Sequence, residues 1–163
     1  MAAIRQPDLR FLLQHPYHFL ALGFGSGLSP KAPGTFGSLA AIPFYLLLSL
    51  ICPAWLIACL AVPLFLWGIP ICGKAGDELG VSDHGAIVWD EIVAMLPLLA
   101  MVPQTVLGWA AAFVLFRIFD ILKPWPIRWV DAKVKGGLGV MLDDVLAALP
   151  AAAILYFLNP YLH

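Results

Sequence analysis

The chain has 163 residues, of which 62% are hydrophobic and 12% charged, and its mean hydropathy is +0.92. Soluble domains carry about 25% charged residues, so the composition predicts an integral membrane protein. The formal net charge of −1 offers no basic field for nucleic acid, and the length suits a single domain over residues 1–163.

The N-terminal segment is expected to stay on the protein. The first sixteen residues contain Arg5, Asp8 and Arg10, but no apolar core followed by a small-residue cleavage site. Residues 11–28 combine a proline, two histidines and several glycines with apolar side chains. They are expected to form an interfacial or re-entrant helix, with His15 and His18 at the membrane interface.

A run without Asp, Glu, Lys or Arg covers the 42 residues between Lys31 and Lys74. One transmembrane helix needs about 20 residues, so the run predicts two crossings. Pro53 lies near its centre, and a proline disfavours a continuous helix. We therefore expect helices at about 34–51 and 54–73.

A second charge-free run has 25 residues between Glu91 and Arg117, and a turn near Pro103 predicts arms at about 85–101 and 105–122. The uncharged C-terminal segment predicts a last helix near 139–158. The expected fold is an all-α, polytopic membrane bundle of about five long helices, in addition to the N-terminal element.

The charged clusters are expected to lie on one side of the membrane, because each hairpin begins and returns near charged residues. The turns at 52–53 and 102–104 and the C-terminus would lie on the other side. Lys and Arg favour the cytoplasmic side, so the charged side is expected to face the cytoplasm.

Every acidic residue except Asp8 lies in three short stretches, 76–91, 117–131 and 143–144. Carboxylates at a membrane boundary are costly unless they are paired, hydrated or bound to metal, and adjacent carboxylates also repel each other. Oxygen ligands from separate helices suit Mg²⁺. The expected metal-binding and catalytic residues are Asp90, Glu91, Asp120, Asp143 and Asp144.

Adjacent helical residues point about 100° apart. Within each of the pairs Asp90–Glu91 and Asp143–Asp144, one carboxylate can therefore bind metal while its neighbour binds water, Lys or Arg, so both members need not be ligands. Glycines at 136–139 are expected to form a turn that brings the second pair to the start of the last helix. The alternative role for that pair is to stabilise the helix dipole.

Cations near the acidic residues are expected to hold phosphate. Arg117, Asp120 and Lys123 share one helix face, with an Arg117–Asp120 salt bridge at the helix end as the alternative. Thr35 is expected to cap the first long helix beside a backbone cradle for an anion, with ordinary capping and close packing as the alternative. The expected substrate-binding residues are Lys31, Thr35, Arg117, Lys123 and Arg128.

Four further residues have weaker signals. Ser82 or Asp83 is expected to cap the helix that carries Asp90. His84 is a second-tier candidate for a proton shuttle, with an incidental interfacial histidine as the alternative, and Asp83 is a second-tier acid. For Arg128, the alternative to phosphate binding is contact with lipid headgroups in general.

These features together predict phosphoryl chemistry on a lipid headgroup. The sequence has no Cys-x5-Arg loop and no DxDx(T/V) nucleophile motif, so a covalent phospho-enzyme is disfavoured. We expect Mg²⁺ to assist attack by water, with a free carboxylate as the general base.

Four motifs follow one another along the chain: GFGSGLSPKAPGTFGSLAAIPF, GVSDHGAIVWDE, FRIFDILKPWPIRW and GGLGVMLDD. With these motifs, the chain resembles the bacterial phosphatidylglycerophosphatase A family from about residue 16 to residue 157. The resemblance implies Mg²⁺-dependent hydrolysis of phosphatidylglycerophosphate to phosphatidylglycerol and inorganic phosphate. It also implies a bacterial inner membrane protein that acts on a phospholipid.

Two other functions use similar residues. A membrane phosphatidyl-alcohol transferase would carry a long DGxxAR…GxxxDxxxD pattern, which this sequence lacks. A non-enzymatic ion transporter would place acidic residues near the middle of the bilayer, whereas here they gather at one edge. The sequence makes no prediction about oligomeric state.

Overall fold

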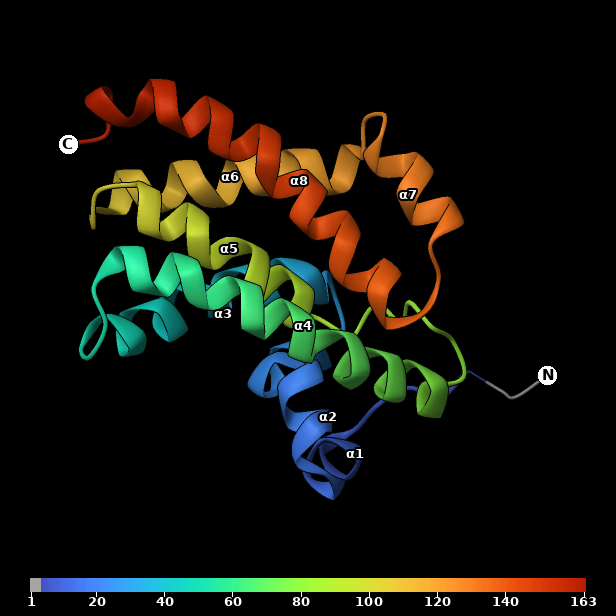
Figure 1. Ribbon diagram of the computed structural model, residues 1–163. Helices are drawn as coiled ribbons and strands as arrows, with labels where there is room; N and C mark the ends of the chain where they lie inside the picture. Colours follow the sequence, from blue (N-terminus) through green and yellow to red (C-terminus); the bar gives the residue numbers. More distant parts are fainter. Residues whose placement is uncertain (1–3) are drawn as a thin grey trace.

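The computed structural model describes residues 4–163, and every regular element in that range is a helix. The described chain contains no strand, which confirms the all-α prediction. Five helices of 13 to 26 residues form the body of the molecule (Figure 1). They are α3 (Pro33–Ser49), α4 (Ala54–Leu79), α5 (Trp89–Met101), α6 (Val106–Leu122) and α8 (Gly136–Leu158).

The N-terminal region differs from the single element expected over residues 11–28. It forms α1 (Leu9–Gln14), α2 (Pro16–Ala21) and the 3₁₀ helix η1 (Gly23–Leu28). The Asp8 side chain caps α1 by accepting a 2.8 Å hydrogen bond from the Phe11 N–H. Pro16 begins a new helix, because proline is favoured in a first turn and disrupts a helix interior.

His18 anchors this region to the bundle and does not lie at an interface as expected. Its ring is fully buried and stacks on Phe11 with the ring centroids 3.8 Å apart. Nδ1 lies 2.8 Å from the Phe11 carbonyl oxygen, and Nε2 lies 3.0 Å from Oε2 of Glu78 on α4. Glu78 also accepts a 2.5 Å hydrogen bond from the Tyr17 hydroxyl.

A short helix that the sequence reasoning missed, α7 (Ile127–Lys133), connects α6 to α8. Helix α6 ends at Leu122, as the arm predicted at about 105–122 does, and Lys123 has a left-handed φ of +42°. The chain then resumes helical geometry at Ile127, and α7 packs against α8.

Two segments are long and apolar enough to cross a membrane, α4 and the stretch from Gly136 to Tyr161. In the most apolar window of α4, only 22% of the residues are buried. A core helix of a soluble protein would be largely buried, so this exposed apolar surface is typical of a helix that faces lipid.

The turns between long helices gather at one end of the molecule. In Figure 1, the α3–α4 turn, the α5–α6 turn and the C-terminus lie at the left, whereas the C-terminal end of α4 and all of α7 lie at the right. The uncharged turns and the charged loops are therefore at opposite ends, as the hairpin pattern predicts.

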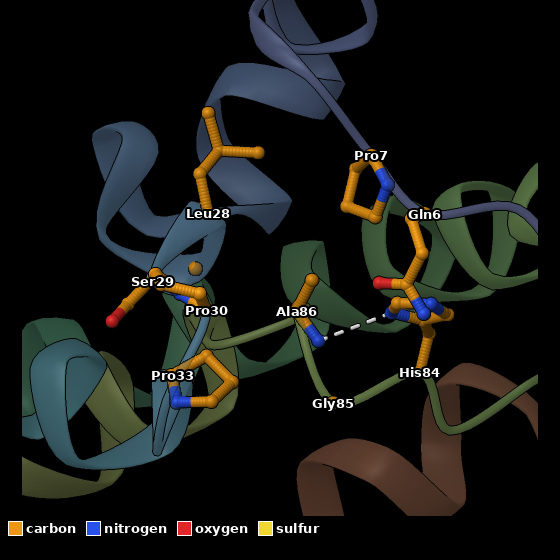
Figure 2. A pocket seen from close by; sticks show the side chains of 10 residues that line it. Gln6, Pro7, Leu28, Ser29, Pro30, Pro33, His84, Gly85 and Ala86 are labelled. Atoms are coloured by element: carbon orange, nitrogen blue, oxygen red, sulfur yellow. Dashed lines mark hydrogen bonds between the residues drawn. The ribbon is translucent and has the colours of Figure 1, made fainter.

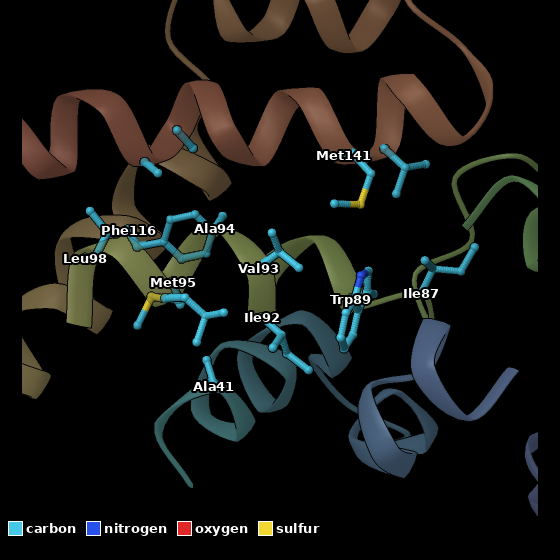
Figure 3. Close-up of a cluster of buried hydrophobic side chains, with 14 of the residues drawn as sticks. Ala41, Ile87, Trp89, Ile92, Val93, Ala94, Met95, Leu98, Phe116 and Met141 are labelled. Carbon is cyan, nitrogen blue, oxygen red and sulfur yellow. The ribbon is translucent and has the colours of Figure 1, made fainter. Parts of the chain in front are cut away.

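Helix α5 occupies the centre of the bundle and packs against α3, α4, α6 and α8. It is apolar on all sides beyond its first turn, and ten of its thirteen residues are buried. Trp89, Ile92 and Met95 lie in the cluster that Figure 3 shows. A helix that is apolar all round belongs in such a position.

Helices α4 and α8 cross at close range, and glycine permits it. A Cβ at Gly137 would collide with the Ile69 carbonyl oxygen of α4. The expectation of a glycine turn at 136–139 is therefore wrong, because these glycines belong to α8 and serve close packing. Asp143 and Asp144 lie about two turns inside α8, which has no acidic residue in its first turn, so they do not cap it.

Candidate functional site

The five carboxylates selected from the sequence are all buried. They come from α5, α6 and α8, and their exposed fractions lie between 2% and 9%. A buried ionised carboxylate is costly unless a cation or hydrogen-bond donors compensate it. The residues are Asp90, Glu91, Asp120, Asp143 and Asp144.

Three of these residues, Asp90, Glu91 and Asp144, form a compact cluster. Each offers a carboxylate oxygen, and these three oxygens lie within 4.8 Å of one another. Asp90 and Glu91 lie in the first turn of α5, where the helix dipole favours negative charge. Both members of this adjacent pair therefore join the cluster.

Asp120 lies beside the cluster and forms an ion pair with Arg117, which confirms the salt bridge considered as an alternative. Arg117 Nη1 also lies 3.8 Å from Glu91 Oε1. The guanidinium therefore links the carboxylate of α6 to the cluster on α5.

Asp143 points toward a different cation. Its Oδ2 lies 2.5 Å from Lys123 Nζ, which is also 3.1 Å from Asp131 Oδ1. Burial alone would lower the pKa of Lys123, but the two carboxylates outweigh burial and raise it. Lys123 thus joins the end of α6 to α7 and α8, and the pair Asp143–Asp144 divides between a cation and the cluster as expected.

Several buried polar atoms have no hydrogen-bond partner within residues 4–163. We call the four carboxylate oxygens among them the orphan oxygens, and the site also contains one such donor, Arg117 Nε. No Lys or Arg in the described chain forms an ion pair with Asp90 or Asp144. The orphan oxygens are Asp90 Oδ1, Glu91 Oε2, Asp143 Oδ1 and Asp144 Oδ2.

This donor set fits a small, hard cation. Buried acceptors in native structures nearly always have a partner, and oxygen ligands from separate elements are typical of divalent-cation sites. The convergence of Asp90, Glu91 and Asp144 supplies such ligands, and a bound cation would compensate their mutual repulsion.

The N-terminal end of α3 lies directly against this site. A Cβ at Gly34 would collide with Glu91 Oε1 and lie 3.2 Å from Arg117 Nη1. The expectation that Thr35 caps this helix is wrong, because α3 already begins at Pro33 and its N-cap, Ala32, makes no side-chain capping bond. The Thr35 N–H instead donates to the Ala32 carbonyl oxygen at 3.0 Å.

The other two cations predicted to bind substrate are on the surface. Arg128 is exposed and, with Lys123, Trp125 and Trp129, lines a shallow hollow of 490 Å³. Lys31 is exposed near the start of α3, and its side chain makes no ion pair with any carboxylate of residues 4–163. The structure therefore brings Arg117 and Lys123 to the buried acids and leaves the other two cations outside.

The prediction that Ser82 or Asp83 caps α5 is wrong. Helix α5 begins at Trp89, and its N-cap is Val88, whose N–H donates to the Ala21 carbonyl oxygen at 2.9 Å. This bond holds the loop against α2, so Ser82 and Asp83 lie too far upstream to be the cap. Asp83 is exposed.

His84 lies in a separate hollow of 450 Å³ that Gln6 and Ser29 also line. In Figure 2, Gln6 lies next to His84, whereas Ser29 lies across the hollow. Its Nδ1 accepts a 3.1 Å hydrogen bond from the Ala86 N–H. Burial lowers the pKa of the ring, so the neutral form is favoured. His84 is not part of the three-carboxylate cluster.

Buried carboxylates beside Arg and Lys, as in this helical protein, are residue types that can bind metal ions and phosphate groups. The model of the family described as Phosphatidylglycerophosphatase A matches residues 19–159. The chain belongs to this family, and it is an enzyme of the phosphatase class.

Two curated relatives cover nearly the whole chain. Phosphatidylglycerophosphatase A of Escherichia coli is 49% identical over 152 residues, which are 92% of this chain and 87% of that protein. Phosphatidylglycerophosphatase A of Haemophilus influenzae is 45% identical over 151 residues, 92% of this chain and 93% of that protein. No solved structure matches the chain.

Proposed function

We propose that this protein hydrolyses phosphatidylglycerophosphate to phosphatidylglycerol and inorganic phosphate in a Mg²⁺-dependent reaction. The names of the two relatives support the substrate and the reaction. The observation that carries the mechanism is the convergence of Asp90, Glu91 and Asp144, with their orphan oxygens. The match to a phosphatase family favours hydrolysis over phosphatidyl transfer or ion transport.

Asp90, Glu91 and Asp144 are proposed to hold Mg²⁺. Bound there, the ion would polarise the phosphate and stabilise the negative charge that develops during its transfer. Asp120 and Asp143 support this arrangement, because their ion pairs hold Arg117 and Lys123 next to the cluster.

Basic side chains of the protein are proposed to bind the phosphate beside the metal ion. Arg117 Nε has no partner among the described residues and can donate to a phosphate oxygen. Lys123 contributes positive charge at the edge of the site, while the exposed Lys31 and Arg128 attract the anionic headgroup at the surface. The backbone around Thr35, at the start of α3, is a further proposed contact for the phosphate.

Water is the proposed nucleophile, without a covalent phospho-enzyme. Its oxygen bonds to phosphorus as the bond between phosphorus and the glycerol oxygen breaks. One of the buried carboxylates accepts a proton from the water, and a proton is returned to the glycerol oxygen that leaves. The products are therefore an alcohol and inorganic phosphate.

The proposed location is a bacterial inner membrane, with residues 1–163 as one multi-pass domain. The two apolar segments that are long enough to span, together with the bacterial sources of the relatives, support this location. The carboxylate cluster lies near the end of the bundle that carries the Lys and Arg residues, so it is proposed to face the cytoplasm.

Phosphate release from phosphatidylglycerophosphate in detergent micelles tests this function. We expect the purified protein to release phosphate with Mg²⁺ and to lose this activity in EDTA. Asp90→Asn and Asp144→Asn should each lower kcat by at least about a hundredfold, because each removes charge from the cluster. Asp77→Asn, at an exposed acid near the end of α4, is the matched control and should retain activity.

A protein that releases phosphate equally well in EDTA would contradict the metal-dependent mechanism. Full activity in both cluster variants would contradict the assigned site, even if the lipid is hydrolysed.

A further inference from the structure

An apolar groove opens between α4, α5 and α8, with a volume of 530 Å³. Every side chain that lines it is apolar. Five alanines leave space that larger side chains would occupy; they are Ala58, Ala61, Ala94, Ala148 and Ala152.

The groove continues directly from the carboxylate cluster. Ala94 is four residues after Asp90, and Ala148 is four residues after Asp144, so each alanine lies about one turn further along the same helix face. Figure 3 shows Ala94 on the side of α5 that faces α8. Ala152 lies one further turn away, about 12 Å along α8 from Asp144.

The groove is accessible from outside the protein along α4. Val62 lines the groove and is 63% exposed, and α4 is the long helix whose apolar surface is mostly uncovered. A hydrocarbon chain can therefore reach the groove sideways from the bilayer, without passing through the polar end of the bundle.

The size of the groove favours a single chain over a helix from a second copy. An α-helix with its side chains is about 10 to 12 Å wide, so a 12 Å length occupies on the order of 1,000 Å³. The groove encloses 530 Å³. It is large enough for a hydrocarbon chain and too narrow for an intact helix.

We propose that this groove binds one acyl chain of the lipid substrate and so sets the depth at which the headgroup phosphate meets the carboxylates. The inference rests on the proposed function, because it assigns a binding site to the tail of the same lipid. The groove lies one turn beyond Asp90 and Asp144, so a lipid seated in it has its polar end directed toward the cluster.

Filling the far end of the groove tests the proposal. Ala152→Phe places a ring where the chain would lie, whereas Ala153→Phe adds the same ring at an exposed position about 100° around α8 and is the matched control. The measurement is kcat/KM for long-chain phosphatidylglycerophosphate and for its water-soluble, fully deacylated form. Wild-type hydrolysis of either substrate tests the proposed function separately.

We expect Ala152→Phe to lower kcat/KM for the long-chain lipid by about tenfold or more, since misfit in an apolar pocket has effects of this size. The value for the deacylated substrate should stay within about twofold of wild type, and Ala153→Phe should leave both values unchanged. An equal loss on both substrates, or no loss on the long-chain lipid, would overturn the proposal.

A second measurement does not depend on the variants. Phosphatidylglycerol with a photoreactive diazirine on one acyl chain is cross-linked to the wild-type protein, and the modified peptides are mapped. Adducts should concentrate in residues 58–65, 93–98 and 142–152, which contain the lining residues. Adducts confined to α3 and α6, which do not line the groove, would contradict the assignment.

Discussion

At the scale of single residues, two partly buried cations, Arg117 and Lys123, divide the acids into those with a cationic partner and those without. Arg117 pairs with Asp120, and Lys123 pairs with Asp143, whereas Asp90 and Asp144 have no cationic partner in the described part of the chain. All five acids that the sequence singled out are buried, and they were conspicuous because the surrounding residues carry no charge. It offered the Arg117–Asp120 pair only as an alternative and did not predict that Lys123 pairs with Asp143, since that contact depends on how α6 and α8 are rotated and how closely they cross.

Lys123→Met tests the ion pair at the edge of the site. It leaves the Asp143 carboxylate, whose side chain is 8% exposed, without its closest cation. The free energy of unfolding should fall by about 2 to 3 kcal/mol, less than for a fully buried pair, because Lys123 keeps 25% of its side chain exposed. The measurement is an unfolding titration in mixed micelles.

The double variant Lys123→Met with Asp143→Asn is the control. It removes both charges, so it should recover at least half of the lost stability. A Lys123→Met protein as stable as wild type would show that the ion pair contributes nothing to the fold.

At the scale of helices, the predicted glycine turn before Asp143 was wrong because close helix packing decides the structure there. Glycine is a poor helix former, so the glycines before Asp143 predicted a turn. They are helical because α8 approaches the α4 backbone too closely for a side chain at Gly137. Helix α7 was missed because the prolines before it are helix-ending signals, although the chain resumes a helix at Ile127.

Gly34→Ala tests the contact between α3 and the site. A Cβ at this position collides with the Glu91 carboxylate, so either α3 or the carboxylate must move. We expect kcat to fall by about tenfold or more, because displacements of about 1 Å have large effects on catalysis. Gly85→Ala is the matched control and should retain activity, since a Cβ there meets nothing within 4 Å. Equal activity in the two variants would contradict a role for this contact.

At the scale of the whole molecule, the arrangement of long helices was predictable from charge-free runs and prolines. Each expected long helix has a counterpart, and the charged loops lie away from the uncharged turns (Figure 1). The N-terminal region was not predictable in this way, because its position depends on specific contacts such as His18 with Glu78. The bundle thus brings acids from α5 and α8 together, although more than fifty residues separate them in the sequence.

Direct metal binding tests the central claim, that Asp90, Glu91 and Asp144 together hold a divalent cation. Mn²⁺ can stand in for Mg²⁺ at oxygen-rich sites, and its binding to the detergent-solubilised protein can be followed by electron paramagnetic resonance without substrate. We predict saturable binding to the wild type and to Asp77→Asn, competition by Mg²⁺, and a loss of affinity of at least about tenfold in Asp144→Asn. Equal Mn²⁺ affinity in wild type and Asp144→Asn would contradict the account.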